Sequence, residues 1–224
     1  PTFSNNSFGF RPNRNGQQAA KQVQSIIKED RRFAVDVDLS KFFDRVNHDL
    51  LMTHLSYKLK DKELLKLIAK YLRAGIMDGN HFVESREGVP QGGPLSPLLA
   101  NIMLDPLDKE LEKRGHKFAR YADDFTILVK SKRAGERILN SISNYLERRL
   151  KLIVNSDKSR VVKTSESKFL GRFIYKSFRS GRIQIHPKTL HRFKEQVRRL
   201  TNRNWGVSMR YQLFKTSQYL RGWI

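Results

Sequence analysis

Two segments with the residue pattern of β-strands, 116–120 and 125–130, meet at two adjacent aspartates in the stretch RYADDFTIL. Strands are generally poor in Asp, and this stretch has neither Gly nor Pro to form a loose surface turn. The pattern therefore predicts a tight, buried hairpin with Asp123 and Asp124 at its tip, where both carboxylates can approach one point despite the alternation of side chains along a strand. An ordinary exposed turn is the alternative for two such aspartates.

A second acidic strand is predicted in RRFAVDVDL, where Val35 and Val37 alternate with Asp36 and Asp38. One face of this strand is then apolar and the other acidic, and the periodicity does not choose between the two aspartates. If the two acidic strands converge, their carboxylates supply the hard oxygen ligands that Mg²⁺ prefers. Two such ions about 4 Å apart can bind the attacking and leaving oxygens of a phosphoryl transfer. The acids therefore indicate a candidate two-metal site.

The overall charge is strongly positive, because 44 Lys and Arg outnumber 22 Asp and Glu for a net charge of +22. A chain of this charge repels itself unless it binds a large polyanion, so nucleic acid is the expected partner. In segments 158–182 and 186–224 the basic residues are interleaved with aromatic residues, which suits a nucleic acid backbone and its bases. Solvated surface is the alternative for these segments. No run reaches the roughly 18 apolar residues of a membrane-spanning helix, so we expect no membrane association.

The chain has no cysteine, which excludes a disulfide framework, thiolate chemistry and a zinc knuckle. It also has no segment typical of a signal or transit peptide. We therefore expect a cytoplasmic location, in a bacterial cytoplasm, with an organelle as the alternative. The chain begins at Pro1, so we expect an excised piece with both ends cut. A homodimer and a monomer are both compatible with the sequence.

Helices and strands are interleaved along the chain, which is typical of an α+β domain. Asp49, Asp61 and Ser96 are the predicted N-caps of three helices, and Pro97 lies in the first turn of the third. The dipeptide Asp78-Gly79 predicts a hairpin turn. Helices are expected at about 16–30, 50–57, 62–74, 96–114, 133–150, 188–202 and 208–222, and further short strands at 160–163, 168–175 and 182–185.

Six segments form an ordered series of motifs: SFGFRPNRN (7–15), DLSKFFDRVNHDLL (38–51), GVPQGGPLSPLLANIMLDPLD (88–108), RYADDF (120–125), LKLIVNSDKSRVV (150–162) and KFLGRFI (168–174). In this order they resemble the conserved blocks of the reverse transcriptase domain of group II intron-encoded proteins, or maturases. A YADD tetrapeptide alone would be a weak match, whereas six ordered blocks over nearly the whole chain are specific. The resemblance implies an α+β right-hand polymerase fold, with partial fingers and the palm over residues 1–185 and the beginning of a helical thumb over residues 186–224.

The resemblance also implies a metal site. In such enzymes the aspartate that opens the motif D-x-x-x-F-F-D is a metal ligand, and here it is Asp38. Asp38 and Asp123 would bind both Mg²⁺ ions, Asp124 would help to hold the ion on the primer side, and the backbone carbonyl of Leu39 would complete the ion on the nucleotide side. Asp36 is then expected to be a hydrogen-bonded or exposed strand residue.

Several further roles follow from the resemblance. Phe43 matches the steric-gate position, where a ring excludes the 2′-hydroxyl of the incoming sugar, so deoxynucleotides are the implied substrates. Gln91 would contact the incoming nucleotide, and Pro90 and Gly92 would lie against the template. Lys158 falls where related polymerases place a cation near the leaving pyrophosphate, as a candidate general acid. The alternatives are a core position for Phe43 and a plain loop before a helix for the segment around Gln91.

The implied primer grip is Phe169, Leu170 and Gly171, with the glycine permitting a bend on which the primer end lies. Arg11 is expected either to bind template phosphates or to brace its own loop. The implied partners are an RNA template, the group II intron RNA, a DNA primer and dNTPs.

The resemblance thus implies an RNA-directed DNA polymerase with a maturase role in splicing and retrohoming. Two alternatives remain open: a non-enzymatic RNA-binding splicing cofactor, and a reverse transcriptase of a related retroelement or of a phage-defence system. Family members begin with a finger block that would lie upstream of Pro1, so we expect this piece alone to be a poor enzyme.

Overall fold

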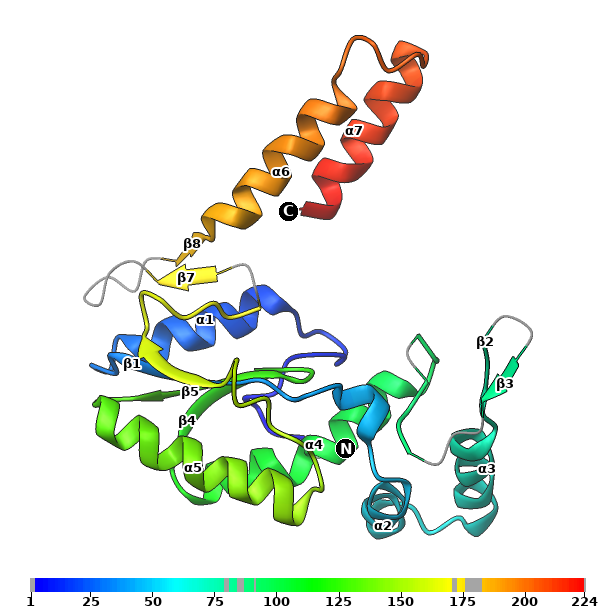
Figure 1. Ribbon diagram of the computed structural model, residues 1–224, viewed down its shortest axis with the longest axis vertical. Helices are drawn as coiled ribbons and strands as arrows, with labels where there is room; N and C mark the ends of the chain where they lie inside the picture. The colour runs from blue at the N-terminus through cyan, green and yellow to red at the C-terminus, as the bar shows by residue number, and fades with distance from the viewer. Residues whose placement is uncertain are drawn as a thin grey trace.

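The computed structural model describes residues 3–78, 81–83, 87–90, 92–170, 173–175 and 183–223 (Figure 1). The elements are α1 (Gly16–Ile27), β1 (Phe33–Val37), the 3₁₀ helix η1 (Phe42–Arg45), α2 (His48–Lys58), α3 (Lys62–Arg73), β2 (Ile76–Asp78), β3 (His81–Val83), α4 (Ser96–Lys113), β4 (Lys117–Tyr121), β5 (Asp124–Val129), α5 (Lys132–Arg149), β6 (Arg160–Lys163), β7 (Phe173–Tyr175), β8 (Ile183–Ile185), α6 (Pro187–Leu200) and α7 (Met209–Trp223).

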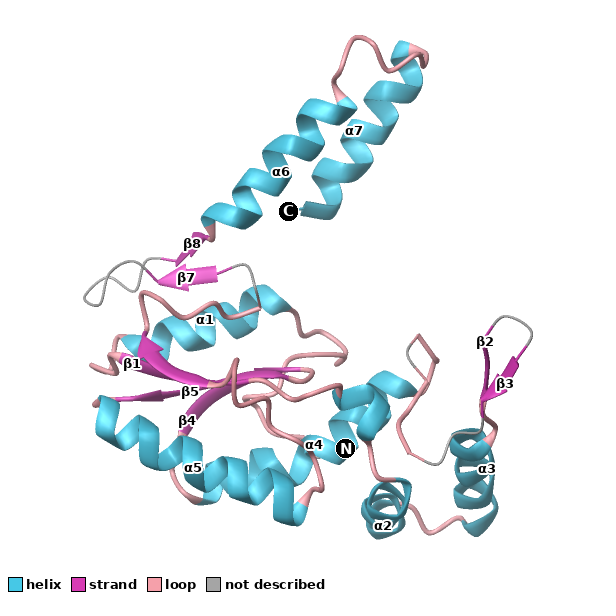
Figure 2. Ribbon diagram, in the orientation of Figure 1, coloured by secondary structure: helices cyan, strands magenta, loops and turns pink. Residues whose placement is uncertain are grey.

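Four antiparallel strands in the order β4-β5-β1-β6 form the central sheet. Helix α1 covers one face of this sheet, and α4 and α5 cover the other (Figures 1 and 2). Helix α2 packs against α4, and α3 packs against α2. Helices α2 and α3 and the β2-β3 hairpin therefore lie to one side of the sheet (Figure 1). The mixture of antiparallel strands and helices confirms the predicted α+β class.

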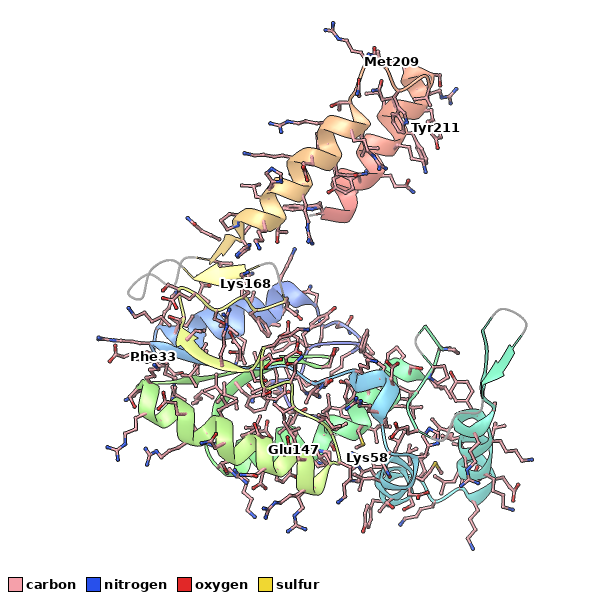
Figure 3. The ribbon with its side chains drawn as sticks, in the orientation of Figure 1. Phe33, Lys58, Glu147, Lys168, Met209 and Tyr211 are labelled. Carbon is pink, nitrogen blue, oxygen red and sulfur yellow. The ribbon has the colours of Figure 1, made fainter. Side chains whose placement is uncertain are left out.

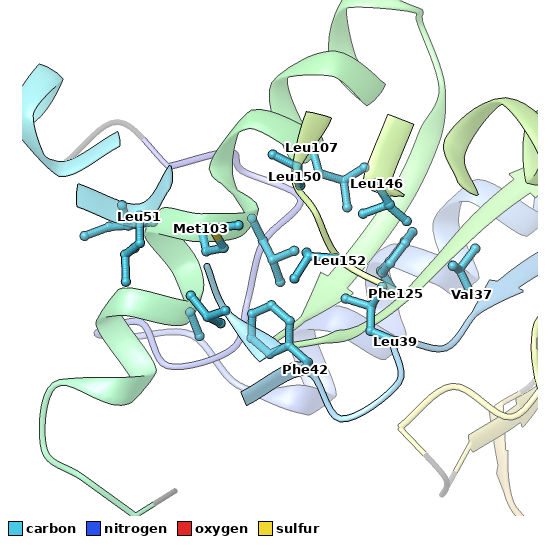
Figure 4. Packing of buried hydrophobic residues seen from close by; sticks show 14 of the residues in the cluster. Val37, Leu39, Phe42, Leu51, Met103, Leu107, Phe125, Leu146, Leu150 and Leu152 are labelled. Carbon is cyan, nitrogen blue, oxygen red and sulfur yellow. The ribbon is translucent and has the colours of Figure 1, made fainter. Parts of the chain in front are cut away.

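The two faces of β1 bury different kinds of side chain, as the alternation in its sequence predicts. Val35 and Val37 are buried in the larger hydrophobic core, which lies between the sheet and helices α4 and α5 and includes Leu39 and Phe125 (Figure 4). Ala34 on the opposite face is buried in a second cluster beneath α1. Burial of these apolar side chains, at roughly 25 cal/mol per Å² removed from water, fixes which way the alternating aspartates point.

The helix starts differ in part from the prediction. Asp61 caps α3 as expected, accepting backbone N–H bonds of the first turn. Asn47, not Asp49, caps α2, with its side chain accepting the N–H of Leu50. The prediction for α4 was also wrong, because Ser96 is already its first helical residue and its hydroxyl bonds a backbone carbonyl in the preceding loop. Asn and Asp are about equally good N-caps, so two nearby candidates cannot be ranked from sequence.

Helices α6 and α7 form a hairpin that projects away from the sheet, and the side chains of Met209 and Tyr211 lie near its far end (Figure 3). The ring of Phe193 on α6 packs against Tyr219 and Trp223 on α7, with ring centroids 5.8 and 4.2 Å apart. No side chain within the described length of α7 is buried. Among the described residues, no helix has the length and apolarity that a membrane span needs.

Candidate active site

The antiparallel register of β1 and β5 brings the predicted acids together. Val37 lies opposite Phe125 in the last pair of this register, so Asp38, which follows β1, comes close to Asp124, the first residue of β5. In the β4-β5 hairpin Tyr121 pairs with Asp124, so the turn itself consists of Ala122 and Asp123. The three aspartates implied by the resemblance therefore lie at one end of the sheet. Asp38 and Asp124 are at the ends of two neighbouring strands, and Asp123 is in the turn between β4 and β5.

The side chain of Asp124 is half-buried on the α1 side of the sheet. Its Oδ2 atom accepts the backbone N–H of Leu170 at 2.9 Å. The pKa of Asp124 is raised to about 7, mainly by burial and in smaller part by the nearby carboxylates of Asp36, Asp123 and Asp38, while this hydrogen bond opposes the shift. Asp124 therefore holds its proton to a higher pH than an ordinary aspartate does.

Asp38 has a more open carboxylate, with 44% of its side chain exposed, and the ammonium of Lys158 lies 3.7 Å from its Oδ2 atom. Its backbone is held firmly: the N–H donates to the Ser159 hydroxyl at 3.0 Å, and the carbonyl accepts the N–H of Asn155 at 2.8 Å. Leu39, the next residue, forms an isolated antiparallel bridge with the 153–155 segment and buries its side chain. The chain around Asp38 is therefore fixed while its carboxylate remains accessible.

Asp36 points to the same face as Asp38 but is used differently. Its Oδ1 atom accepts hydrogen bonds from the hydroxyls of Thr126, at 2.9 Å, and Ser167, at 2.8 Å. Burial raises the pKa of Asp36, and these hydrogen bonds oppose the shift. The expectation that Asp36 is a hydrogen-bonded strand residue is confirmed, and Asp38 is the accessible acid of the pair.

The arrangement of the acids differs from a ready-made metal site. Within the described part of the chain, no three His, Cys, Asp or Glu side chains stand close enough together to hold one. The carboxylates of Asp38 and Asp124 are turned toward Lys158 and the Leu170 amide instead. The donor chemistry does fit Mg²⁺, because several carboxylates crowd here and a divalent cation would relieve the repulsion that raises the pKa of Asp124. Ligation would require these carboxylates to turn away from their present partners.

Phe43 follows Asp38 closely in the sequence, within the same motif. Phe42 is buried in the core, whereas Phe43 is only half-buried, and the two rings meet edge to face with centroids 5.1 Å apart. Of the two alternatives for this pair, Phe42 takes the core position. The half-buried ring of Phe43 remains a candidate steric gate.

The loop that precedes α4 is docked onto the Phe43 segment by three hydrogen bonds. The N–H of Val89 donates to the Phe43 carbonyl at 2.6 Å, and the N–H of Gly88 donates to the Val46 carbonyl at 2.8 Å. The buried ring of His48 donates from Nε2 to the Gly88 carbonyl at 2.6 Å. Gly88 has φ +87°, and a Cβ there would lie 2.8 Å from the backbone of η1, so only glycine fits. Sequence analysis missed His48, although its motif was part of the resemblance.

The rest of this loop holds three predicted nucleotide or template residues. The Pro90 carbonyl accepts the N–H of Gly93 and the Ser96 hydroxyl, so it is engaged in starting α4. Gly92 is exposed with φ +82° and has open space where a side chain would be, which permits close approach of another molecule. Gln91 lies outside the described residues.

Arg11 points into its own loop. Its guanidinium donates to the carbonyls of Ser4 and Ser7 and lies over the ring of Phe3, 5.7 Å from its centroid. Burial and the neighbouring Arg14 lower the pKa of Arg11. Of the two roles expected for Arg11, this geometry supports bracing of the loop.

The implied primer grip is only partly available to a ligand. The ring of Phe169 is 1% exposed and packs in the cluster beneath α1, so it cannot itself contact a primer. Leu170, with φ +57°, instead contacts the site through its backbone bond to Asp124. Gly171 lies outside the described residues. Of the described residues of this grip, Leu170, which is half-buried, is the one that a primer could contact.

A sheet backed by two helices, with acids from neighbouring strands at one end, defines the palm of a nucleic acid polymerase. The chain belongs to the reverse transcriptase family: residues 1–174 match the family described as "Reverse transcriptase (RNA-dependent DNA polymerase)". The relatives to which it is similar include proteins named as group II intron-encoded proteins. It is 28% identical to the group II intron-encoded protein LtrA of Lactococcus lactis, over 86% of this chain and 43% of that protein.

Two further relatives and one solved structure are also similar to this chain. The chain is 33% identical to protein YkfC of Escherichia coli, over 82% of this chain and 58% of that protein, and 31% identical to a putative COX1/OXI3 intron 2 protein of Saccharomyces cerevisiae, over 76% and 27%. The structure of apo telomerase from Candida tropicalis matches with a TM-score of 0.63 at 14% identity, over 88% of this chain and 38% of that one, which shows a shared fold. The chain thus spans between about a quarter and three fifths of these curated relatives.

Proposed function

We propose that this chain is the palm and part of the fingers of an RNA-directed DNA polymerase of a group II intron, which adds dNTPs to the 3′-hydroxyl of a DNA primer on an RNA template. The observation that carries the proposal is that Asp38, at the end of β1, comes close to Asp124, at the start of β5, beside Asp123 in the turn. A protein of net charge +22 that binds polyanions gains nothing from three acids facing its ligand unless they hold cations.

Reverse transcriptases generally depend on a divalent metal, and here Asp38, Asp123 and Asp124 would supply carboxylate oxygens to two Mg²⁺ ions, with the Leu39 carbonyl as a further ligand. Bound Mg²⁺ would ease proton loss from the primer hydroxyl and neutralise charge on the triphosphate. The protein itself contributes position. Rigid strands and the clamped backbone of Asp38 hold the acids in place, which is where most of the rate enhancement of phosphoryl transfer arises.

The nucleotide would lie between this acidic end of the sheet and the loop before α4. Phe43 would exclude a 2′-hydroxyl, Gln91 would contact the base or sugar, and Gly92 would let the backbone approach the template pair. Lys158, whose side chain is 69% exposed next to Asp38, is free to swing toward a leaving pyrophosphate and to donate a proton there.

The partners proposed are the RNA template, the group II intron RNA and the DNA primer, with a maturase role alongside polymerisation. The helical hairpin α6-α7 would begin the thumb, after fingers and palm that end near residue 185. Its exposed basic side chains would contact nucleic acid backbone, so RNA affinity is expected to fall steeply with rising salt.

A non-enzymatic RNA-binding cofactor is the rival function, and one experiment separates the two. The full-length protein and its Asp123→Asn variant are assayed for primer extension on an RNA template with dNTPs and Mg²⁺, and for RNA binding. Extension by the wild type should be lost in the variant and with chelator, while RNA affinity persists. Equal extension by both proteins would overturn the site, and no extension by the wild type would favour the cofactor.

Sugar selection gives a second prediction. Phe43→Val is expected to raise the use of rNTPs relative to dNTPs by about tenfold or more, because removing a ring that collides with one hydroxyl is worth roughly 1–3 kcal/mol. The ratio of kcat/KM for rNTP and dNTP addition measures this. Phe42→Leu is the matched control, since its ring is in the core, and it should lower stability without changing the ratio. An unchanged ratio in Phe43→Val would remove the gate role.

A further inference from the structure

A fully buried arginine lies directly beneath the acidic turn, defined as residues 121–124. The side chain of Arg120 has 0% exposure, and all its hydrogen-bonding nitrogens are engaged. Nε and Nη2 donate to the two carboxylate oxygens of Asp108 at 2.7 and 2.6 Å, and Nη2 also donates to the Ser7 hydroxyl at 2.8 Å. Nη1 donates to the side-chain oxygen of Asn101 at 3.0 Å and to the carbonyl of Ala122 at 2.8 Å. One cation thus links α4, the N-terminal segment and the turn.

The turn needs such support because its second residue, Ala122, is strained. Ala122 has φ +58°, a left-handed conformation that costs a non-glycine residue roughly 1–2 kcal/mol. Arg120 donates to the carbonyl of this same residue, directly before Asp123. The bond therefore holds the peptide that sets the direction of the acids.

The backbone of the N-terminal segment also contacts the turn. A Cβ at Gly9 would lie 2.3 Å from the backbone nitrogen of Ala122, so the two backbones are in direct contact. Asn101 also donates to the Gly9 carbonyl at 2.9 Å, and the N–H of Phe8 donates to the Arg120 carbonyl at 2.8 Å. The SFGF motif therefore packs against the turn at the same point as the arginine.

Stability alone does not require this ion pair. Apolar residues of similar volume often replace a buried pair at no cost in stability, whereas removal of one partner leaves a buried charge unpaired. An apolar pair, however, could not donate a hydrogen bond to the Ala122 carbonyl. That bond is the contribution that only a donor at this position can make.

We infer that Arg120 is a positioning residue for catalysis. Through its hydrogen bond to the Ala122 carbonyl, and with the Gly9 backbone packed against the turn, it holds the acidic turn in the left-handed conformation that presents Asp123 and Asp124. The inference rests on the proposed polymerase function. Loss of the bond should loosen the acids, so it should lower kcat and raise the Mg²⁺ concentration needed for half-maximal rate. RNA affinity and the KM for dNTP depend on other residues and should change little.

The test uses the full-length protein and the double variant Arg120→Met/Asp108→Leu, which removes both charges together. We expect a folded protein whose kcat is on the order of 100-fold lower, as small displacements of reacting groups produce. Its Mg²⁺ midpoint should rise, with RNA affinity within about twofold of wild type. The matched control is Lys58→Met/Asp105→Leu, which removes a 2.9 Å ion pair between α2 and α4 that makes no contact with the turn; it should leave both quantities unchanged.

Rescue separates positioning from a general structural role. Ala122→Gly, added to the double variant, should restore part of the lost kcat, because glycine adopts the left-handed conformation without strain. If the double variant does not fold, Gly9→Ala tests the same point with the ion pair intact, and it should show the same fall in kcat and rise in the Mg²⁺ midpoint. A folded variant of either kind with wild-type values would overturn the inference. An inactive wild type would overturn the proposed function instead.

Discussion

Replacing Asp38 by Asn is expected to slow primer extension by the full-length protein by about 10³-fold or more. The substitution keeps the shape of the side chain but removes the negative charge proposed to bind both metal ions, and each tenfold loss in rate corresponds to about 1.4 kcal/mol of transition-state stabilisation. Its backbone contacts to Asn155 and Ser159 do not involve the carboxylate, so the fold should be retained. Single-turnover extension with saturating dNTP measures the effect.

The chain offers a closely matched control in Asp36, two residues earlier on the same face of β1. Asp36→Asn makes the same chemical change, but this side chain is half-buried and accepts hydrogen bonds from Thr126 and Ser167. We expect a moderate loss of stability and an extension rate within a few-fold of wild type. If the two variants lose activity equally, the accessible carboxylate of Asp38 has no special role and the acids act only through the fold.

Local patterns were sufficient to predict the strands that carry the acids. The alternation of valine and aspartate in β1 predicted an apolar face, and Val35 and Val37 are indeed buried. The hairpin was also predicted, but both acids were expected at its tip. Only Asp123 lies in the turn, while Asp124 begins β5 and its side chain is half-buried. The difference arises because Ala122 takes a left-handed conformation, which residue preferences do not predict for alanine.

The network around Arg120 could be predicted only in part. Strand alternation places Arg120 on the same face as Phe118, so the pattern alone is sufficient to predict that the charge of Arg120 points inward. Asn101 and Asp108 likewise share one face of α4 at helical spacing, within a run of apolar residues. That these groups meet depends on which helix covers that face of the sheet. This is a long-range property that no local pattern contains.

Stability should depend on pH through Asp124. Its carboxyl has a pKa of about 7 in the folded protein, mainly because of burial, against 3.8 as the ordinary value. As pH rises from 4 to 7 the unfolded chain loses this proton while the folded protein keeps it, so stability falls over that range and is constant above it. By linkage the loss approaches about 4 kcal/mol above pH 7 in the absence of metal.

Asp124→Asn should remove this loss, since an amide does not ionise and its oxygen can still accept the Leu170 N–H. In urea unfolding with chelator present, we expect the variant to be more stable than wild type, with a gap that widens by about 2 kcal/mol between pH 5.5 and 8. Asp49→Asn, at an exposed aspartate, is the control and should show no such widening.

The same substitution should lower primer extension, because Asp124 is a proposed ligand of the primer-side ion. A variant that gains stability at pH 8 while losing activity would show that the position of this acid serves activity and lowers the stability of the folded protein. Mg²⁺ provides a second readout, since it should stabilise the wild type more than the variant by binding the ionised carboxylate. A pH-independent gap between the two proteins would mean that Asp124 is already ionised in the folded state at pH 5.5, and that the hydrogen bond from the Leu170 N–H outweighs its burial.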